Sequence, residues 1–494
     1  MKYSINNFIK NRPKTKIVCT IGPSTGEIEI LKKLIKEGMS VARLNLSHGE
    51  TKEHIRYVEN CRKSAEELKV PLGILIDIPG PKYRVGKLPN NSISLKKGQK
   101  IILGSENEIE NGIARKVKVW PEGLKKDLNK IKIIFLDDGA IKLNVQKTKG
   151  NEIFCTVINT ALLKSNKSVT IPGSISKLDY FTEETVKGLK LARKVNATFV
   201  GLSFIRNEKD VKKVKEYFKN SDFNPQLISK IELPSSVPYL KEIIYESDGV
   251  MVARGDLGVQ LPLEKVPRIQ KIIIEEANHQ GKPVITATQM LESMIESPSP
   301  TRAEATDIHN AVMDGTDAIM LSAESAAGSY PVEVVSTMDK VAIEVEKDPI
   351  HRQVLEAARP PSRRGVSNAI TVAAREVAET TNVKAICCFT HSGTTALLTC
   401  RERPRVPIIA LTPKIGTARR LTLNWGLHCV VTEEVERFKM AVVSAARAAR
   451  EHGFASKKDK IIVTAGVPFN VPGTTNILRV APVREQGIYD GDID

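Results

Sequence analysis

The sequence has few cysteines and no long apolar run, and these two absences exclude several classes of protein. No apolar stretch approaches the length needed to cross a membrane. The first 14 residues lack the apolar segment of an export signal, so we expect a cytoplasmic protein without a membrane partner. The seven cysteines show no Cys-x-x-Cys spacing, which argues against zinc and disulfides and favours reduced, buried thiols.

Acidic residues are outnumbered by basic ones, and the formal net charge is +17. Such a charge can attract nucleic acid, an anionic membrane or small anionic substrates. The cations are spread along the whole chain, without a basic tail, a zinc-finger spacing or a basic run interleaved with aromatic residues. We therefore expect no nucleic-acid binding, and we interpret the charge as a means of drawing phosphate-bearing substrates into a cleft.

From Thr15 onward, short apolar strands alternate with longer amphipathic helical segments. This alternation indicates a parallel sheet, and eight repeats predict an α/β fold of the (β/α)₈ or TIM-barrel type. The barrel domain is predicted to comprise residues 15–85 and 173–347, after an N-terminal arm at 1–14. The eight predicted strands are 15–21, 40–44, 73–77, 198–203, 226–230, 249–253, 283–287 and 317–321.

A long insertion interrupts the third strand-to-helix connection of this barrel. Residues 86–172 exceed the length of a normal loop and have apolar runs of their own, such as Ile131–Leu136. Asp137-Asp138-Gly139 follows that run as a turn signal. We predict a small β-barrel lid domain hinged over the barrel mouth, where it would exclude water during group transfer. The alternative is an insertion without a function.

The alternation restarts after Lys347 and predicts a separate C-terminal α/β domain at residues 348–482. Pro360-Pro361-Ser362 is its predicted linker, and 483–494 is predicted to be a loose acidic tail. The loop Thr390–Thr394 precedes a predicted helix, so it could bind a phosphate-bearing effector or simply cap that helix. Gly466–Asn476 is a second loop that could face it.

Polar residues or tight turns follow all eight predicted strands, which is where (β/α)₈ barrels carry their active sites. Lys230, Glu232 and Asp256 stand out because carboxylates and a lysine at neighbouring strand ends suit Mg²⁺ and an anion. A set of structural salt bridges at the sheet rim is the alternative. The remaining strand-end residues are Gly22-Pro23-Ser24, Arg43, Asn45, Ser47, His48, Asp77, Ser203, Arg206, Arg254, Gly255, Thr286, Thr288, Gln289, Ser322 and Glu324.

A set of ordered motifs resembles the pyruvate kinase family over nearly the whole chain. These motifs are Ile21-Gly22-Pro23-Ser24, residues 43–49, Ser229-Lys230-Ile231-Glu232, residues 251–258, residues 286–294, Pro300-Thr301-Arg302-Ala303-Glu304, residues 320–324 and residues 463–468. The resemblance implies phosphoryl transfer from phosphoenolpyruvate to ADP, giving pyruvate and ATP, with Mg²⁺ or Mn²⁺. It also implies a homotetramer with contacts near Arg302 and through the C-terminal domain.

The resemblance further implies roles for individual residues. Glu232 and Asp256 would bind the metal, and Lys230, Arg43 and Thr288 would be catalytic, with Thr288 orienting a water relay because it is too weak an acid to act alone. Phosphoenolpyruvate would be bound by Lys230, Ala253, Gly255, Asp256 and Thr288, and the nucleotide by Arg43, Asn45, His48, Arg84 and Lys167. Asp138 would approach the nucleotide–metal complex when the lid closes.

The exit of the third strand departs from the family pattern. Most members have Asp-Thr-Lys-Gly-Pro-Glu-Ile-Arg where this chain has Asp77-Ile78-Pro79-Gly80-Pro81-Lys82-Tyr83-Arg84. In most members, residues matching Asn45, Ser47, Asp77 and the carbonyl of Ile78 bind K⁺, and a glutamate matches Lys82. The Lys82 ammonium could replace that ion, so we predict that K⁺ is not required. The alternative is a lysine that extends into solvent.

A second departure lies in the lid, where residues 167–173 read Lys-Ser-Val-Thr-Ile-Pro-Gly in place of the usual Lys-Gly-Val-Asn-Leu-Pro-Gly. Two other functions remain open at this level. A citrate-lyase-like, Mg²⁺-dependent aldolase or lyase of 2-keto acids would lack the lid and Arg43, Asn45 and His48. A non-catalytic binding protein would fit the basic charge but not the intact set of catalytic residues.

Overall fold

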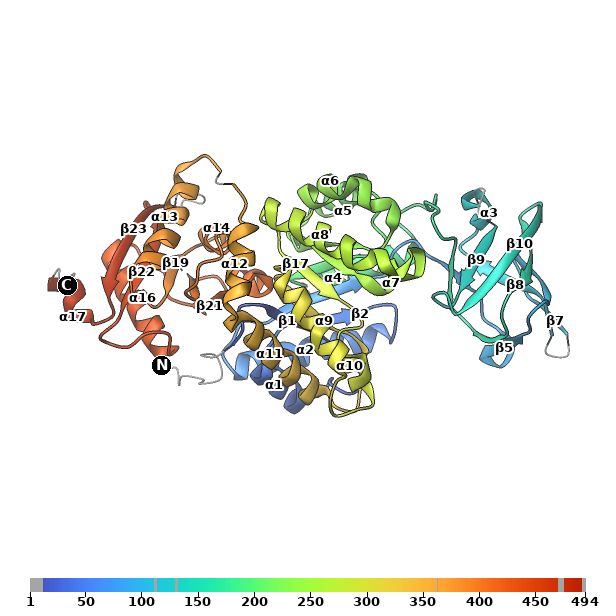
Figure 1. Ribbon diagram of the computed structural model, residues 1–494, viewed down its shortest axis with the longest axis horizontal. Helices are drawn as coiled ribbons and strands as arrows, with labels where there is room; N and C mark the ends of the chain where they lie inside the picture. The colour runs from blue at the N-terminus through green and yellow to red at the C-terminus, as the bar shows by residue number, and fades with distance from the viewer. Residues whose placement is uncertain (1–11, 111–112, 129–131, 362, 470–474, 491–494) are drawn as a thin grey trace.

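The computed structural model describes residues 12–110, 113–128, 132–361, 363–469 and 475–490. Parts of the predicted arm, lid strand, linker, second loop and tail, including Ile131 and Ser362, therefore lie outside the described residues. The molecule is elongated, with the inserted β domain at one end, the barrel in the middle and the C-terminal α/β domain at the other end (Figure 1). None of the described helices is long and apolar enough to span a membrane.

The central sheet is a closed, fully parallel barrel in the order β1-β18-β17-β16-β15-β14-β3-β2, so the predicted (β/α)₈ fold is confirmed. Its strands are β1 (Lys16–Thr20), β2 (Met39–Asn45), β3 (Gly73–Ile78), β14 (Phe199–Leu202), β15 (Gln226–Ile231), β16 (Gly249–Ala253), β17 (Val284–Ala287) and β18 (Ala318–Leu321). Each begins and ends within two residues of its predicted bounds, because each is a short apolar run between polar segments.

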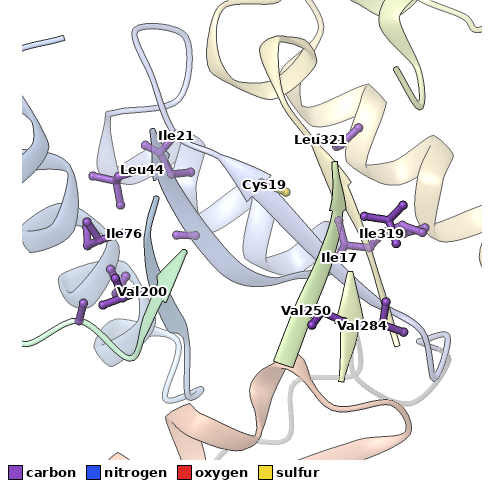
Figure 2. Close-up of a cluster of buried hydrophobic side chains, with 14 of the residues drawn as sticks. Ile17, Cys19, Ile21, Leu44, Ile76, Val200, Val250, Val284, Ile319 and Leu321 are labelled. Atoms are coloured by element: carbon purple, nitrogen blue, oxygen red, sulfur yellow. The ribbon is translucent and has the colours of Figure 1, made fainter. Parts of the chain in front are cut away.

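Side chains alternate between the inside and the outside of the barrel wall. Val18 packs in the barrel interior with Leu75, whereas its neighbours Ile17 and Cys19 join the layer between sheet and helices. Figure 2 shows this outer layer, with side chains from several strands. Side chains of a β-strand point alternately to its two faces. Both faces of these strands are buried, which explains why the strands are uninterrupted hydrophobic runs.

Helices cover the outside of the barrel. They are α1 (Ile28–Glu37), α2 (Thr51–Glu67), α4 (Glu183–Lys194), α5 (Glu208–Phe218), α6 (Leu240–Glu246), α7 (Arg254–Gln260), α8 (Val266–Gln280), α9 (Arg302–Met313), α10 (Ala323–Ala326) and α11 (Pro331–Lys347). Thr301 begins α9 with a reciprocal capping box to Glu304. A single 3₁₀ turn precedes α8, and Pro267 lies in its first turn, where a missing N–H costs nothing.

The inserted domain is a second, smaller barrel with its own hydrophobic core. Its sheet runs β4-β13-β9-β10-β11-β6-β8-β7 and is closed by pairing of β4 with β8. The elements are β4 (Tyr83–Val85), β5 (Ser92–Leu95), β6 (Lys100–Gly104), β7 (Glu108–Glu110), β8 (Ile113–Trp120), α3 (Leu124–Asp127), β9 (Ile133–Leu136), β10 (Ile141–Lys149), β11 (Glu152–Val157), β12 (Ala161–Lys164) and β13 (Ser168–Thr170). The predicted turn joins β9 to β10, with φ of 51°, 49° and 94° at residues 137–139.

The C-terminal domain has a five-stranded sheet in the order β21-β20-β19-β22-β23. Its elements are α12 (Pro349–Ala357), α13 (Val366–Thr380), β19 (Ile386–Phe389), α14 (Thr394–Arg401), β20 (Ile408–Thr412), α15 (Ile415–Arg420), β21 (Leu427–Val431), α16 (Phe438–Glu451), β22 (Lys460–Gly466), β23 (Thr475–Pro482) and α17 (Glu485–Asp490). The antiparallel strand β23 was not predicted. The prediction of a loose tail was wrong for the residues that the structure describes. Val483 and Ile488 are buried in the domain core, and helix α17 follows β23.

The C-terminal domain closes the N-terminal end of the barrel. Leu423 belongs to its 3₁₀ turn Leu421–Leu423 but packs in the barrel interior with Val18 and Val41. Arg403 forms an ion pair with Asp317 at 3.0 Å across the same boundary. The opposite end of the barrel, where the strands finish, is left for the inserted domain.

We expect the barrel interior to carry much of the stability of the fold. Phe199 on β14 is 1% exposed, and its replacement by alanine should lower the free energy of unfolding by about 3–5 kcal/mol, because the cavity cannot fully collapse. Tyr245→Ala is the control, since that side chain is 73% exposed and should change stability by about 0.5 kcal/mol or less. Urea unfolding of both variants makes the comparison, and equal losses would contradict this account of the core.

Candidate active site

An ionic network lies at the ends of strands β2, β3 and β15. The Asp77 carboxylate, 1% exposed, accepts from Arg43 Nε at 2.8 Å and pairs with Arg43 Nη2 at 2.7 Å. Its other oxygen lies 3.2 Å from Lys230 Nζ. Burial alone would raise the pKa of Asp77, but the charges of Lys230 and Arg43 outweigh it and lower that pKa. Asp77 therefore stays ionised and compensates two buried cations.

Lys230 is held on three sides. Its Nζ donates to Ser203 Oγ at 2.8 Å and lies 2.8 Å from Glu232 Oε1, in addition to its pair with Asp77. Burial would lower the pKa of Lys230, but these two carboxylates outweigh it and raise that pKa. A charged ammonium is thus fixed in a buried position, which is the arrangement suited to stabilising a second, transient anion.

Glu232 has one oxygen without a hydrogen bond. Its Oε2 accepts from the backbone N–H of Phe204 at 2.6 Å, whereas the buried Oε1 has the ion pair with Lys230 but no hydrogen-bond partner. Burial raises the pKa of Glu232 to about 7. Phe204 has φ of 57°, a conformation that a residue with a side chain seldom adopts and that directs its N–H at Glu232.

The two carboxylates predicted as metal ligands fit a hard divalent cation. Glu232 offers Oε1, which lies 2.8 Å from the Lys230 ammonium, and Asp256, one-third exposed, lies in the first turn of α7. Within the described part of the chain, no group of three or more His, Cys, Asp or Glu side chains gathers as a metal site. Two protein oxygens suit Mg²⁺, which keeps waters and takes substrate oxygens for the rest of its shell.

Thr288 lies against the turn that begins α7. Its Oγ1 accepts from the Gly255 N–H at 2.8 Å and donates to the Ala287 carbonyl at 2.6 Å. Thr288 and Gln289 have φ of 70° and 54°, so two successive residues are in the left-handed region. The Arg254 guanidinium holds this bend by donating to the Thr288 carbonyl at 2.6 Å. Two of the residues predicted to bind phosphoenolpyruvate, Gly255 and Thr288, are therefore in contact.

The predicted nucleotide-binding residues form one positive region beside this cluster. Burial and the charges of Arg84, Arg43 and Lys167 lower the pKa of His48. On the lid, Lys167 Nζ lies 2.8 Å from Asp137, and Arg84 donates to the carbonyl of Asn166 at 3.2 Å. The positive region thus spans both the barrel rim and the root of the lid.

The residues predicted to bind a monovalent cation lie in two places, an exposed turn with Asn45 and Ser47 and the buried end of β3 with Asp77 and Ile78. Asn45 Oδ1 accepts from the Ser47 N–H at 3.1 Å in an exposed turn, and Ile78 is fully buried at the end of β3. Asp77 is engaged by Arg43 and Lys230. The arrangement leaves the K⁺ prediction untested.

Lys82 turns inward, which contradicts the alternative of a lysine extending into solvent. Its side chain is 16% exposed, and Nζ lies 3.2 Å from Asp256 and 3.3 Å from Asp138. The ammonium also lies 4.9 Å from the centre of the Phe204 ring. Burial would lower the pKa of Lys82, but Asp256, Asp138 and Glu232 outweigh it and raise that pKa.

Two contributors to the site had no predicted role. Ser203 was recognised only as a strand-end residue, yet it binds Lys230 and donates to Asp77 at 3.3 Å. Phe204 contributes a backbone N–H and a ring face, and neither carries a signal in a sequence pattern. The position of Ser203 directly after β14 was the one signal that could have found it.

Comparison with known proteins agrees with this geometry. The family model "Pyruvate kinase, barrel domain" matches residues 12–335, and "Pyruvate kinase, alpha/beta domain" matches residues 368–481. A pyruvate kinase of Clostridium acetobutylicum is 40% identical over 471 residues, 95% of this chain and 99% of that protein. One of Staphylococcus epidermidis is 41% identical over 488 residues, 97% of this chain and 83% of that protein.

Among solved structures, a pyruvate kinase from Cryptosporidium parvum matches with a TM-score of 0.88 and 34% identity, covering 97% of this chain and 98% of that one. The barrel, its inserted lid and the fixed lysine thus define a phosphotransferase built on a (β/α)₈ barrel. The chain belongs to the pyruvate kinase family. This membership decides against the lyase and the binding-protein alternatives.

Gly80 provides a test of how tightly the site is packed. A Cβ at Gly80 would lie 2.3 Å from the Ser203 carbonyl oxygen, so Gly80→Ala should displace backbone and lower stability by about 1–3 kcal/mol. Gly416→Ala is the matched control, because nothing lies within 4 Å of its Cβ and it sits within helix α15, where alanine should stabilise by about 0.5–1 kcal/mol. Chemical denaturation should show a lower free energy of unfolding for Gly80→Ala and a higher one for Gly416→Ala.

Proposed function

We propose that this enzyme transfers the phosphoryl group of phosphoenolpyruvate to ADP, with Mg²⁺ or Mn²⁺, in the cleft between the barrel mouth and the lid. The observation that carries the proposal is the buried Lys230 ammonium, which lies 2.8 Å from the buried Glu232 carboxylate. Phosphoryl transfer needs little covalent chemistry from the protein and relies on positioning and on neutralising the charge of the moving group. A fixed lysine next to a carboxylate pair supplies that combination.

Glu232 and Asp256 are the residues that would hold the divalent cation. Bound there, the cation would neutralise negative charge on the substrate and on the phosphoryl group in transfer. The Phe204 N–H keeps Glu232 oriented by occupying its Oε2 and leaving Oε1 for a ligand. Family members generally use Mg²⁺, and its role in this chain rests on these two carboxylates.

Lys230 would stabilise the phosphoryl group as it leaves the substrate. Its Nζ is positioned by Ser203 and Asp77, so little reorganisation is needed when charge develops beside it. Arg43, fixed by Asp77 and by the Thr20 hydroxyl at 2.9 Å, would contact the phosphates of both substrates. Fixing both cations on one carboxylate keeps the distance between them constant.

The carboxylate of phosphoenolpyruvate would lie against Ala253, Gly255 and Thr288, and the hydrogen bond between Gly255 and Thr288 supports this assignment. The enolate that remains after transfer must be protonated at carbon, and the Thr288 hydroxyl would orient the water that delivers this proton. On the other side, Arg43, Asn45, His48, Arg84 and Lys167 would bind ADP. Asp138 on the lid turn would reach the nucleotide and its cation upon closure.

Two further assignments belong to this proposal. A homotetramer would use α9 near Arg302 and the C-terminal domain as contacts. A phosphate-bearing effector would bind at residues 390–394, where the Gly393 N–H donates to Thr390 Oγ1 at 2.9 Å and α14 begins at Thr394. Capping of α14 without a ligand is the competing account of that loop.

Replacement of Lys230 tests the proposed chemistry. Lys230→Met should lower kcat by about 10²–10³-fold, because one preorganised charge at the transferring group is lost. The rate of pyruvate formation from phosphoenolpyruvate, ADP and Mg²⁺, followed with a coupled lactate dehydrogenase, measures this. Lys213→Met removes a half-exposed lysine of α5 as a control and should keep the wild-type rate. A Lys230→Met enzyme with more than a tenth of the wild-type kcat would contradict the assignment.

The Lys82 ammonium is proposed to replace K⁺. The support is its inward position among the acidic residues Asp256 and Asp138. Rates in a tetramethylammonium buffer should therefore be the same with and without KCl, whereas Lys82→Glu should become dependent on KCl, because two charge units change beside the substrate phosphate. Strong KCl activation of the wild-type enzyme would refute the proposal.

A further inference from the structure

The two departures from the family pattern, one on the barrel and one on the lid, meet at a single carboxylate. Lys82 Nζ lies 3.3 Å from Asp138 Oδ1, and the same oxygen accepts from Ser168 Oγ at 2.6 Å. The Asp138 N–H donates back to Ser168 Oγ at 2.8 Å. Ser168 thus fixes the Asp138 carboxylate in the direction of Lys82.

Lys82 connects the Asp138 carboxylate of the lid turn to the barrel. Lys82 Nζ also lies 3.2 Å from Asp256 Oδ1, so one ammonium joins the lid turn to the loop that begins α7. Among the ion pairs between described residues, Lys82–Asp138 is the one that links residues 86–172 to the rest of the chain. The turn itself lies close to α7, because a Cβ on Gly139 would be 3.7 Å from Val259.

We propose that Lys82 is a positioning residue that latches the lid turn to Asp256 while the metal site is empty, and that a divalent cation opens this latch by taking Asp256. The proposal rests on the assignment of Asp256 as a metal ligand. A cation bound to Asp256 would repel the ammonium 3.2 Å away and leave it with Asp138 alone. The lid turn would then lose its connection to the barrel. The cation would therefore bind before the nucleotide.

Two variants separate the two ends of the latch. Lys82→Met removes both ion pairs, whereas Asp138→Asn removes the lid end and leaves Lys82 with Asp256. Both should free the lid in the absence of metal. Only Lys82→Met should strengthen metal binding, because only it removes the charge that competes for Asp256. Replacing a residue that has only a structural role would not increase the affinity for the metal.

The lid is followed by fluorescence energy transfer between engineered cysteines at Lys149 on β10 and Glu275 on α8, both exposed. The seven native cysteines are buried, so the engineered pair is labelled selectively. In the wild-type chain, Mg²⁺ should shift or broaden the distance distribution. Both variants should show that distribution already without Mg²⁺, and Lys118→Met, an exposed lysine near the lid root, should behave as wild type. An unchanged distribution in Lys82→Met would overturn the latch.

Metal affinity is measured with Mn²⁺, from the paramagnetic resonance signal of the free ion. Lys82→Met should bind Mn²⁺ about two- to fivefold more tightly, the size expected for one competing, partly exposed ion pair. Asp138→Asn should show no increase. Glu232→Gln should weaken Mn²⁺ binding at least tenfold, and if it does not, the proposed metal site is wrong. If Glu232→Gln weakens binding but Lys82→Met leaves it unchanged, the site stands and the latch is refuted.

Discussion

The buried carboxylate of Asp77 is the interaction on which the site depends. Without it, the buried Arg43 would lose its carboxylate partner, and the buried Lys230 would be left with Glu232 as its remaining carboxylate. The barrel register makes the contact with Lys230 possible, because the strand between β3 and β15 carries Gly201 opposite Asp77. A Cβ on Gly201 would lie 3.3 Å from the carboxylate, so the absence of a side chain keeps the path to Lys230 open.

Three of the residues with strained backbone lie beside Glu232 and Thr288 or are Thr288 itself. Phe204, Thr288 and Gln289 all have positive φ without being glycine, and each follows a barrel strand. Such conformations cost free energy and persist when the surroundings hold them, here through Glu232 for Phe204 and Arg254 for Thr288. These conformations direct the Phe204 N–H at Glu232 and place the Thr288 hydroxyl against the Gly255 N–H.

Much of the fold could be predicted from the sequence because local patterns and global structure agree. The strands of the barrel are apolar runs between polar segments, and each lies within two residues of its predicted bounds. Strand β23 was missed because it follows a loop rich in glycine and proline, and α17 because an acidic segment gave no sign that Ile488 is buried. At the site, the positions of the strand ends predicted that the polar residues lie near one another. They did not predict which carboxylates Lys82 contacts or which N–H donates to Glu232.

Lys82 illustrates the cost of building a cation into the protein. A K⁺ ion leaves when the anions that need it leave, whereas a lysine stays and needs a partner in every state. In the structure its partners are Asp256 on the barrel and Asp138 on the lid turn. When a divalent cation and phosphates occupy the cleft, the same ammonium is repelled by the first and attracted by the second. In the proposed latch, the fixed charge of Lys82 would couple the lid to the occupancy of the metal site.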